Sequence, residues 1–412
     1  MKKITALSLT LLLIILPADG FNRDGQADAL AYVVRTDNKG DNELARVRQL
    51  IQTKLNELHA TAEFPGATIG FVLPDGRFGS VSVGVADIEN KKPLAPTDRM
   101  LAGSIGKTFV AAVTLQLAGE GRVNLDEKIE HWFGREAWFN RLPNAKDITL
   151  RMLMNHTSGI PEHVLRQDFI AATHANPDRI WKPEELIAYI FDAKPLFAAG
   201  QNFSYADTNY ILVGMIVERV TKRKLYTEVA RRLLKPLGLA NTIPSDRRTL
   251  PGVITGYSRP DSPFKINGRV IVDGKFIINP QMEWTGGGFA STAEDLARWA
   301  KAMYEGKAFK KPYLDQMLVG IEAREGRGAG AKYGLGVQIF QGQLGASYGH
   351  GGWFPGYLSQ MEYFPEHRIS VAIQFNTDAA SKLKKGLRAY VADVARILIN
   401  EVSANMNPKS KT

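Results

Sequence analysis

The chain has 412 residues, of which 44% are apolar and 23% charged, so it can bury a large core and is not intrinsically disordered. Its formal charge of +10 favours anionic surfaces, but the basic residues are spread along the chain and no nucleic-acid-binding module is recognisable. There is no cysteine for a disulfide bond, and the seven histidines show no metal-binding spacing. We therefore expect a globular protein without a metal or other cofactor.

The first 20 residues predict a secretory signal peptide. Two lysines precede an apolar run at residues 4–16, and residues 18–20 have the small-residue pattern of a cleavage site. The apolar run is too short for a permanent transmembrane helix, so no stable membrane span is expected. We predict a periplasmic or secreted protein, with residues 21–42 forming a polar linker after the signal peptide.

A helix and a β-hairpin are predicted next. Residues 43–58 have helical periodicity, and residues 66–73 and 80–86 have the alternation of two strands. The sequence Pro-Asp-Gly at residues 74–76 predicts the turn after the first of them.

Ser104 and Lys107 lie three residues apart at the start of a predicted buried helix, so they share one face of it. A serine hydroxyl is a weak nucleophile, and an amine or ammonium within hydrogen-bond reach can accept its proton or stabilise its alkoxide. The helix start also places unpaired backbone N–H groups near the serine. This pairing predicts acyl transfer with Ser104 as nucleophile; the alternative is that Ser104 only caps the helix.

Two other motifs nearly match at the same place. A phosphate-binding loop ending at Gly106-Lys107-Thr108 needs a glycine where Leu101 stands, and a Gly-x-Ser-x-Gly elbow needs one in place of Ala102. Both interpretations are weaker than Ser-x-x-Lys.

The middle of the chain, residues 106–285, is predicted to be mostly helical. Tyr205 lies two residues before Asp207 and just before a buried helix at residues 211–220, where a phenol could relay a proton. Pro183 and the two acids after it predict a helix N-terminus, so no hydrolytic glutamate is assigned there.

The C-terminal part returns to strands. His350 lies in a glycine-rich stretch, residues 349–356, where the backbone can run close to a ligand. Strands are predicted at residues 357–364 and 369–375, and a helix at 379–399. Strands at both chain ends with helices between them predict an α/β (α+β) fold, in which one antiparallel sheet from the N- and C-terminal segments carries an inserted, mostly helical subdomain.

The predicted organisation has five parts. They are a signal peptide (1–20), a linker (21–42), a sheet-and-helix subdomain (43–105 plus 286–400), a helical subdomain (106–285) and a tail (401–412).

The motifs together resemble the serine β-lactamase and penicillin-binding-protein family, specifically its class C-like branch. That branch includes class C β-lactamases, serine D-Ala-D-Ala carboxypeptidases, D-aminopeptidases and β-lactamase-like (class VIII-type) esterases. The resemblance covers residues 43–399 and includes His-Thr-Ser-Gly at 156–159. It implies a β-lactamase/transpeptidase-like fold, with Ser104 acylated, Lys107 as its activator and Tyr205 as proton relay. It also implies an oxyanion hole from the N–H groups of Ser104 and Trp353.

Two departures from the family pattern bear on the substrate. The usual Tyr-x-Asn is Tyr205-Ala206-Asp207 here, and an ionised aspartate only accepts hydrogen bonds, so Asp207 either holds Lys107 charged or meets a different substrate. The usual Lys-Thr-Gly is His350-Gly351-Gly352, which resembles carboxypeptidases and aminopeptidases more than β-lactamases. Histidine there would give a weaker, pH-sensitive charge for a substrate carboxylate.

We therefore expect a secreted active-site serine hydrolase, a D-Ala-D-Ala carboxypeptidase-like enzyme or D-amino-acid peptidase. The alternatives are a β-lactamase or β-lactamase-like esterase, and an inactive relative that binds penicillin or peptidoglycan. The expected partners are a small peptide, ester or β-lactam substrate, together with peptidoglycan. The expected substrate-binding residues are Asp207, His350, Gly352 and Trp353.

Overall fold

The computed structural model describes residues 38–323 and 331–406. The predicted signal peptide and residues 21–37 of the predicted linker lie outside the described residues. In the described chain, the α-helices are α1 (Asn38–Thr61), α2 (Gly106–Gly119), α3 (Glu130–Phe133), α4 (Leu150–Met154), α5 (Gln167–Ala175), α6 (Pro183–Ile187), α7 (Asp207–Thr221), α8 (Leu225–Val229), α9 (Ala293–Tyr304), α10 (Tyr313–Met317) and α11 (Leu387–Met406).

The strands are mostly short outside the main sheet. They are β1 (Gly66–Val72), β2 (Phe78–Asp87), β3 (Lys92–Pro93), β4 (Met100–Leu101), β5 (Ile243–Pro244), β6 (Tyr257–Ser258), β7 (Gly268–Arg269), β8 (Ile271–Val272), β9 (Lys275–Phe276), β10 (Phe289–Ser291), β11 (Ile321–Glu322), β12 (Lys332–Tyr333), β13 (Gln338–Gly342), β14 (Gly345–Phe354), β15 (Tyr357–Phe364) and β16 (Ile369–Phe375).

One antiparallel sheet of nine strands joins the two ends of the chain. Its order is β11-β12-β13-β14-β15-β16-β1-β2-β3, so the first long strand pairs with the last. In that pair Ile69 lies opposite Ile373. The predicted sheet from N- and C-terminal segments is therefore confirmed, and β15 and β16 have the predicted bounds.

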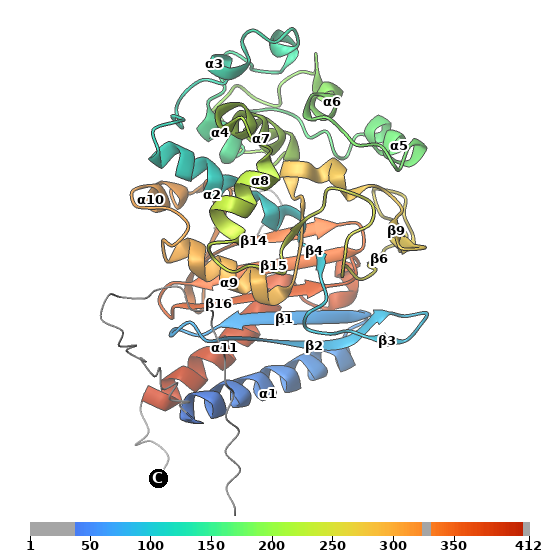
Figure 1. Ribbon diagram of the computed structural model, residues 1–412, viewed down its shortest axis with the longest axis vertical. Coiled ribbons are helices and arrows are strands. Elements are labelled where there is room, and N and C mark those ends of the chain that lie inside the picture. The colour runs from blue at the N-terminus through green and yellow to red at the C-terminus, as the bar shows by residue number, and fades with distance from the viewer. Residues whose placement is uncertain (1–37, 324–330, 407–412) are drawn as a thin grey trace, which may run out of the picture. The chain divides into compact units, whose positions relative to one another are not determined.

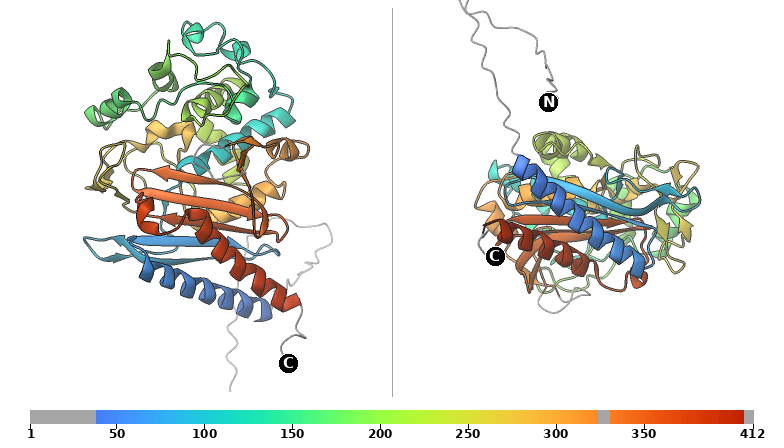
Figure 2. Two further views of the ribbon diagram at one scale, coloured as in Figure 1. Left: turned by 180° about the vertical axis from the view of Figure 1, so that it is seen from behind. Right: turned by 90° about the horizontal axis from the view of Figure 1, so that it is seen from below.

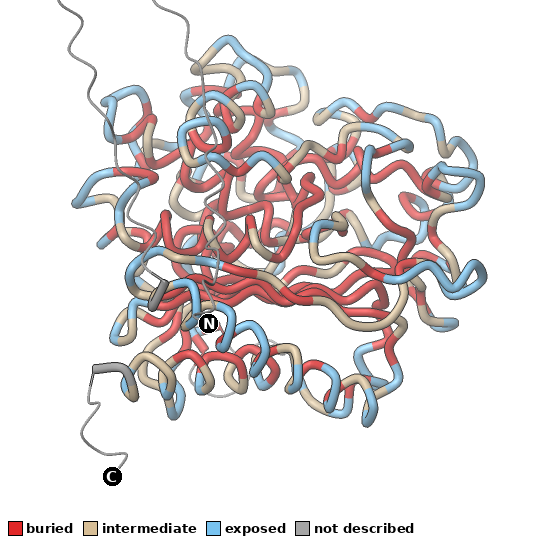
Figure 3. The backbone as a smooth tube through the Cα atoms, turned by 60° about the horizontal axis from the view of Figure 1, so that its bottom comes forward, coloured by how far each residue is buried: buried red, intermediate tan, exposed pale blue. Residues whose placement is uncertain are grey.

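Helices cover both faces of this sheet. Helix α9 contacts β1, β15 and β16, while α11 contacts β15 and β16. Val47, Ile51 and Leu55 of α1 pack in the same hydrophobic cluster as Val391 of α11. Figures 1 and 2 show α1 and α11 side by side below the strands. Every residue of β1, β15 and β16 is buried, as expected for strands covered on both faces, and Figure 3 shows this buried central layer.

The second half of the fold, on the α9 face of the sheet, is mostly helical (Figure 1). Helix α2 is apolar nearly all round and buried along its length, which makes it the central helix of this part. It contacts α7, α8 and the 3₁₀ turn that precedes it. Helix α6 begins at Pro183 as predicted, and the Glu185 side chain accepts a hydrogen bond from the Lys182 N–H at 2.8 Å.

Several predicted boundaries are wrong, most clearly those of the two terminal helices. Helix α1 starts at Asn38, inside the predicted linker, and α11 continues to Met406, inside the predicted tail. The helix predicted from residue 379 begins only at Leu387, because Lys384 adopts a left-handed conformation (φ 61°) that ends a short 3₁₀ turn. No helix in the described ranges is long and apolar enough to cross a membrane.

Candidate active site

Ser104 lies on a 3₁₀ turn, Gly103–Ile105, that leads directly into α2. The turn requires glycine at position 103, where φ is +53° and a β-carbon would lie 2.6 Å from the Trp353 nitrogen. The backbone at Ser104 is therefore held against β14, with the helix N-terminus directly after it.

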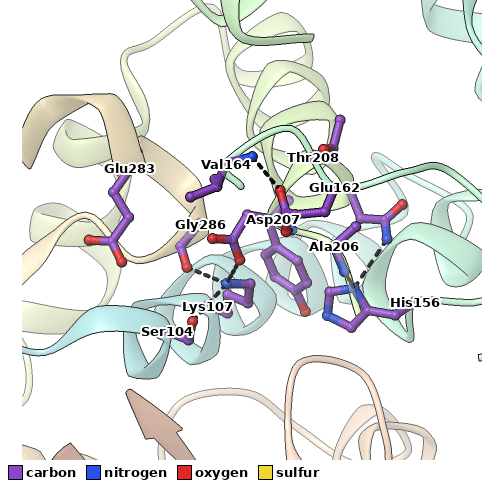
Figure 4. Close-up of polar contacts among 12 residues, drawn as sticks. Ser104, Lys107, His156, Glu162, Val164, Ala206, Asp207, Thr208, Glu283 and Gly286 are labelled. Atoms are coloured by element: carbon purple, nitrogen blue, oxygen red, sulfur yellow. Dashed lines mark hydrogen bonds and ion pairs between the residues drawn. The ribbon is translucent and has the colours of Figure 1, made fainter. Parts of the chain in front are cut away.

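Lys107 is the centre of the site. Its side chain has no exposed surface, and its Nζ lies 3.1 Å from the Ser104 Oγ. The same Nζ also donates to the Asp207 Oδ1 and to the Gly286 carbonyl oxygen (Figure 4). Three acceptors match the three N–H donors of an ammonium group. The predicted pairing of Ser104 with Lys107 is thus present in the structure.

Tyr205 and Asp207 reach the site from the start of α7. Asp207 is the first residue of that helix, and Ala206 before it is extended. The Lys107 Nζ lies 4.9 Å from the centre of the Tyr205 ring, and that ring packs on His156 with 4.2 Å between ring centres. The structure therefore brings Ser104, Lys107, Tyr205 and Asp207 together, while the role of Tyr205 as proton relay stays a prediction.

His156 supports the start of α7. Its Nδ1 lies 3.2 Å from the Ala206 N–H nitrogen and 3.1 Å from the Asn209 Nδ2. Asn209 in turn accepts a hydrogen bond from the Ser158 hydroxyl at 2.6 Å. The His-Thr-Ser-Gly stretch thus orients the helix that carries Asp207, and His156 acts as framework.

Two further carboxyl groups lie near Lys107 and were missed from the sequence. Glu162 accepts hydrogen bonds from the Asp207 N–H at 2.6 Å and the Val164 N–H at 2.9 Å. Glu283 is buried and accepts a hydrogen bond from the Gly288 N–H at 3.1 Å. The position of Glu162 shortly after the His-Thr-Ser-Gly stretch was a usable signal, whereas nothing local marks Glu283.

Burial dominates the electrostatics of these acids. It raises the pKa of Asp207; the charge of Lys107 opposes that rise, and the Glu162 carboxylate adds to it. Although burial acts against ionisation of Glu162, hydrogen bonds from His163 and the two backbone N–H groups hold its pKa below the usual value. Burial raises the pKa of Glu283 to about 8. The site therefore contains one acid whose pKa lies below its usual value, Glu162, and two whose pKa is raised, Asp207 and Glu283.

Gly352 and Trp353 lie on β14 beside the nucleophile turn. A β-carbon at Gly352 would lie 2.0 Å from the Ala102 carbonyl oxygen, and Ser359 of β15 donates to that oxygen at 2.8 Å. The backbones of Ala102 to Ser104 and of β14 are therefore in direct contact. This arrangement is compatible with the oxyanion hole predicted from the Ser104 and Trp353 N–H groups, which stays a prediction.

His350 is also on β14, but its side chain is only 1% exposed. Its Nε2 lies 2.8 Å from the Tyr333 hydroxyl, and its Nδ1 lies 2.5 Å from the Gly351 carbonyl oxygen. The same hydroxyl lies 3.3 Å from the Nε2 of His156. His350 thus belongs to an internal polar chain behind Tyr205, and its predicted contact with a substrate carboxylate stays a prediction. Among the described residues, no cluster of three or more His, Asp or Glu side chains is arranged to hold a metal.

The comparisons with known proteins agree with this geometry. A D-aminopeptidase from Brucella anthropi is 27% identical over 332 residues, which are 77% of this chain and 58% of that enzyme. The chain therefore spans little more than half of that relative. A D-stereospecific amidohydrolase from Streptomyces sp. is 28% identical, with 82% of this chain and 97% of that one covered and a TM-score of 0.70.

A D-amino acid amidase from Ochrobactrum anthropi SV3 has the same fold. Its TM-score is 0.72 at 23% identity, over 89% of this chain and all of that one. The family model described as Beta-lactamase matches residues 47–396, which include all the site residues described above. The chain therefore belongs to the Beta-lactamase family, the serine hydrolase family that also contains penicillin-binding proteins.

Proposed function

We propose that this protein is an active-site serine hydrolase that works through an acyl-enzyme on Ser104. The observation that carries the proposal is the 3.1 Å contact between the Ser104 Oγ and the Nζ of the fully buried Lys107. A lysine buried beside a serine at a helix start is costly unless it is paired, and here it is hydrogen bonded to the hydroxyl that would react.

The proposed substrates are small peptides or amides in which the bond to be cleaved adjoins a D-amino acid. The names of two relatives, a D-aminopeptidase and a D-stereospecific amidohydrolase, support this class. A D-Ala-D-Ala carboxypeptidase-like activity falls in the same class. Asp207, paired with Lys107, and Glu162, which accepts the Asp207 N–H, disfavour a substrate carboxylate beside them, so they support a D-aminopeptidase or amidase more than a carboxypeptidase.

In the proposed reaction, the Ser104 Oγ attacks the substrate carbonyl carbon. The backbone N–H groups of Ser104 and Trp353 stabilise the oxyanion, and Tyr205 protonates the departing amine as the C–N bond breaks. Water then attacks the acyl ester on Ser104 and releases the acid.

The test compares the wild type with Ser104→Ala on D-alanine p-nitroanilide, L-alanine p-nitroanilide and a D-Ala-D-Ala peptide, with intact mass recorded during turnover. The expected result is Ser104-dependent release from the D-substrates and a transient acyl adduct on the wild type alone. Hydrolysis that persists in Ser104→Ala, or a complete lack of turnover and adduct, would contradict the proposal.

Esterase activity is a second candidate, because Asp207 stands where the family usually has asparagine. An ionised Asp207 cannot donate a hydrogen bond to an amide carbonyl of the substrate. Faster turnover of D-alanine p-nitrophenyl ester than of the matched anilide, by more than the intrinsic reactivity of the ester, would favour this candidate.

Export to the periplasm or outside the cell, where peptidoglycan would be a partner, is a proposal that rests on residues 1–20 of the sequence alone. The N-terminal sequence of the protein recovered from cell fractions tests it. A chain retained in the cytoplasm with its first 20 residues intact would contradict it.

A further inference from the structure

Lys107 has an unusual set of partners for a residue that activates a serine. The Gly286 carbonyl oxygen and an ionised Asp207 can only accept hydrogen bonds, so Nζ must donate to both. Its third contact is the Ser104 Oγ at 3.1 Å. In this arrangement Lys107 is a triply hydrogen-bonded ammonium, and it presents no lone pair that could accept the Ser104 proton.

Asp207 favours this charged form of Lys107. The Lys107 side chain has no exposed surface and the Asp207 side chain is 16% exposed, so the opposite charges interact with little screening by water. For Ser104 to lose its proton to Nζ, one of the protons on Nζ has to move elsewhere. Asp207 is the partner of Lys107 that can take it, because a carbonyl oxygen such as that of Gly286 is a far weaker base.

Burial and the Glu162 carboxylate favour that proton on Asp207, while the charges of Lys107 and His163 oppose it. Lys107 faces it from α2, Glu162 and His163 face it from the loop before α5, and Glu283 faces it from the turn before Gly286. The nearest acid is Glu162, whose carboxylate accepts the N–H of Asp207 itself at 2.6 Å. His163 is fully buried, and its Nδ1 lies 3.3 Å from Glu162 and 2.9 Å from the Thr208 hydroxyl.

Two negative charges so close together make proton uptake by one of them favourable. Glu162 is stabilised as a carboxylate by its two N–H donors and His163, and the Asp207 Oδ1 is the carboxylate oxygen to which Lys107 Nζ already donates. The proton therefore goes to Asp207 rather than to Glu162.

We propose that Asp207 takes up, through Lys107, the proton that leaves Ser104 during acylation. As the Oγ–carbon bond forms and the carbonyl electron pair moves to the oxygen, the Ser104 proton passes to Nζ and one Nζ proton passes to the Asp207 Oδ1. Lys107 remains an ammonium throughout. When the leaving group has received a proton from Tyr205, the Asp207 proton returns through Lys107 to the Tyr205 oxygen, and all groups regain their starting states.

This inference rests on the proposed function and makes Asp207 a residue that acts through Lys107, without itself touching the substrate. The matched variant is Asp207→Asn, because asparagine keeps the shape and an oxygen acceptor for Nζ but cannot take a proton. In that variant no carboxylate can take a proton from Nζ, so the Ser104 proton has to leave to a base from solvent such as hydroxide, whose concentration rises with pH.

The experiment measures labelling of Ser104 by a fluorophosphonate, by intact mass, from pH 5 to pH 10. This reaction forms an Oγ–phosphorus bond and expels fluoride, so it needs the same loss of the Ser104 proton but no particular peptide. We expect Asp207→Asn to be labelled about 100-fold more slowly than the wild type near pH 6.5, with a deficit that shrinks as the pH rises. The surface replacement Asp147→Asn, whose side chain is 73% exposed, should behave as the wild type.

Glu162→Gln provides a second and independent variant if Asp207→Asn does not fold. Glutamine still accepts the Asp207 N–H but carries no charge, so Asp207 binds its proton less tightly. The acidic limb of the labelling profile should then move to lower pH.

Three results would overturn the inference. The first is an Asp207→Asn variant that is labelled as fast as the wild type at every pH. The second is a labelling rate of Asp207→Asn that is reduced by the same factor at every pH, which indicates a structural role. An unchanged acidic limb in Glu162→Gln is the third. A wild type that is not labelled at Ser104 removes the proposed function as well, whereas normal Ser104 labelling with no effect of Asp207→Asn removes this inference alone.

Discussion

Replacing Glu283 with glutamine is expected to remove a large part of the pH dependence of this protein's stability. Glu283 is only 7% exposed, and a β-carbon at Gly287 would lie 2.0 Å from its Oε1, so the loop after it packs directly on the carboxyl group. Its hydrogen bond from the Gly288 N–H and the field of Lys107 favour ionisation but do not compensate for burial, which raises its pKa to about 8.

The magnitude follows from the linkage between proton binding and folding. In the unfolded chain the carboxyl group titrates near its ordinary value of 4.5, and in the folded chain near 8. Between these values the folded state holds a proton that the unfolded state has lost, so stability is fully present below pH 4.5 and falls as the pH rises towards 8. The complete gap corresponds to about 5 kcal/mol, and the loss between pH 5 and pH 8 to roughly 3–4 kcal/mol.

Glutamine has nearly the shape of a protonated glutamate and keeps an oxygen for the Gly288 N–H, but it does not titrate. Urea unfolding of the wild type and Glu283→Gln, followed by tryptophan fluorescence at pH 5, 6, 7 and 8, measures the difference. As the pH rises from 5 to 8, the free energy of unfolding should fall less for the variant than for the wild type. Glu63→Gln, with a side chain that is 77% exposed, is the control. If the free energies of unfolding of the wild type and Glu283→Gln differ by the same amount at every pH in this range, the reasoning is refuted.

Two further predictions concern the site itself. Tyr205→Phe keeps the ring next to Lys107 but removes the hydroxyl, so kcat on D-alanine p-nitroanilide should fall by about 10²–10⁴-fold while the melting temperature changes little; unchanged kcat would exclude Tyr205 as proton relay. Gly352→Ala places a methyl group 2.0 Å from the Ala102 carbonyl oxygen and should abolish Ser104 labelling. Gly351→Ala comes closer than 3.8 Å only to the end of the Gln360 side chain, at 2.9 Å, and should retain labelling. Equal labelling of the two alanine variants would show that the contact with β14 does not position Ser104.

The strands of the main sheet could be predicted closely because their signals are local. The strands at 357–364 and 369–375 are rich in aromatic and aliphatic residues and have turn residues between them, and their observed bounds are those predicted. A sheet built from both chain ends also followed from the pattern, because strands occur at both ends and helices between them, whereas the pairing of β1 with β16 within it came from the structure. Boundaries failed where a single backbone conformation decided them, as at Lys384, whose positive φ no hydrophobic pattern reveals.

The nucleophile and its activator were also visible in the sequence, for a short-range reason. Ser104 and Lys107 are one helical turn apart, and helix geometry alone puts them on one face. The order of the later motifs indicated that Tyr205, Asp207 and β14 belong to the same site. In the structure, Tyr205 and Asp207 lie next to Lys107, and β14 lies against the Ser104 turn.

The sequence by itself thus determined the strands and the Ser104–Lys107 pair, since these depend on periodicity and on spacing within a few residues, and its motifs indicated the family by resemblance. Only the tertiary structure decided the charge state of the site. The Gly286 carbonyl that binds Lys107 is 179 residues away along the chain, and Glu162 meets Asp207 across 45 residues. Such contacts, and the burial that raises the pKa of Asp207 and Glu283, exist only after the whole chain has packed, because desolvation depends on every element surrounding the group.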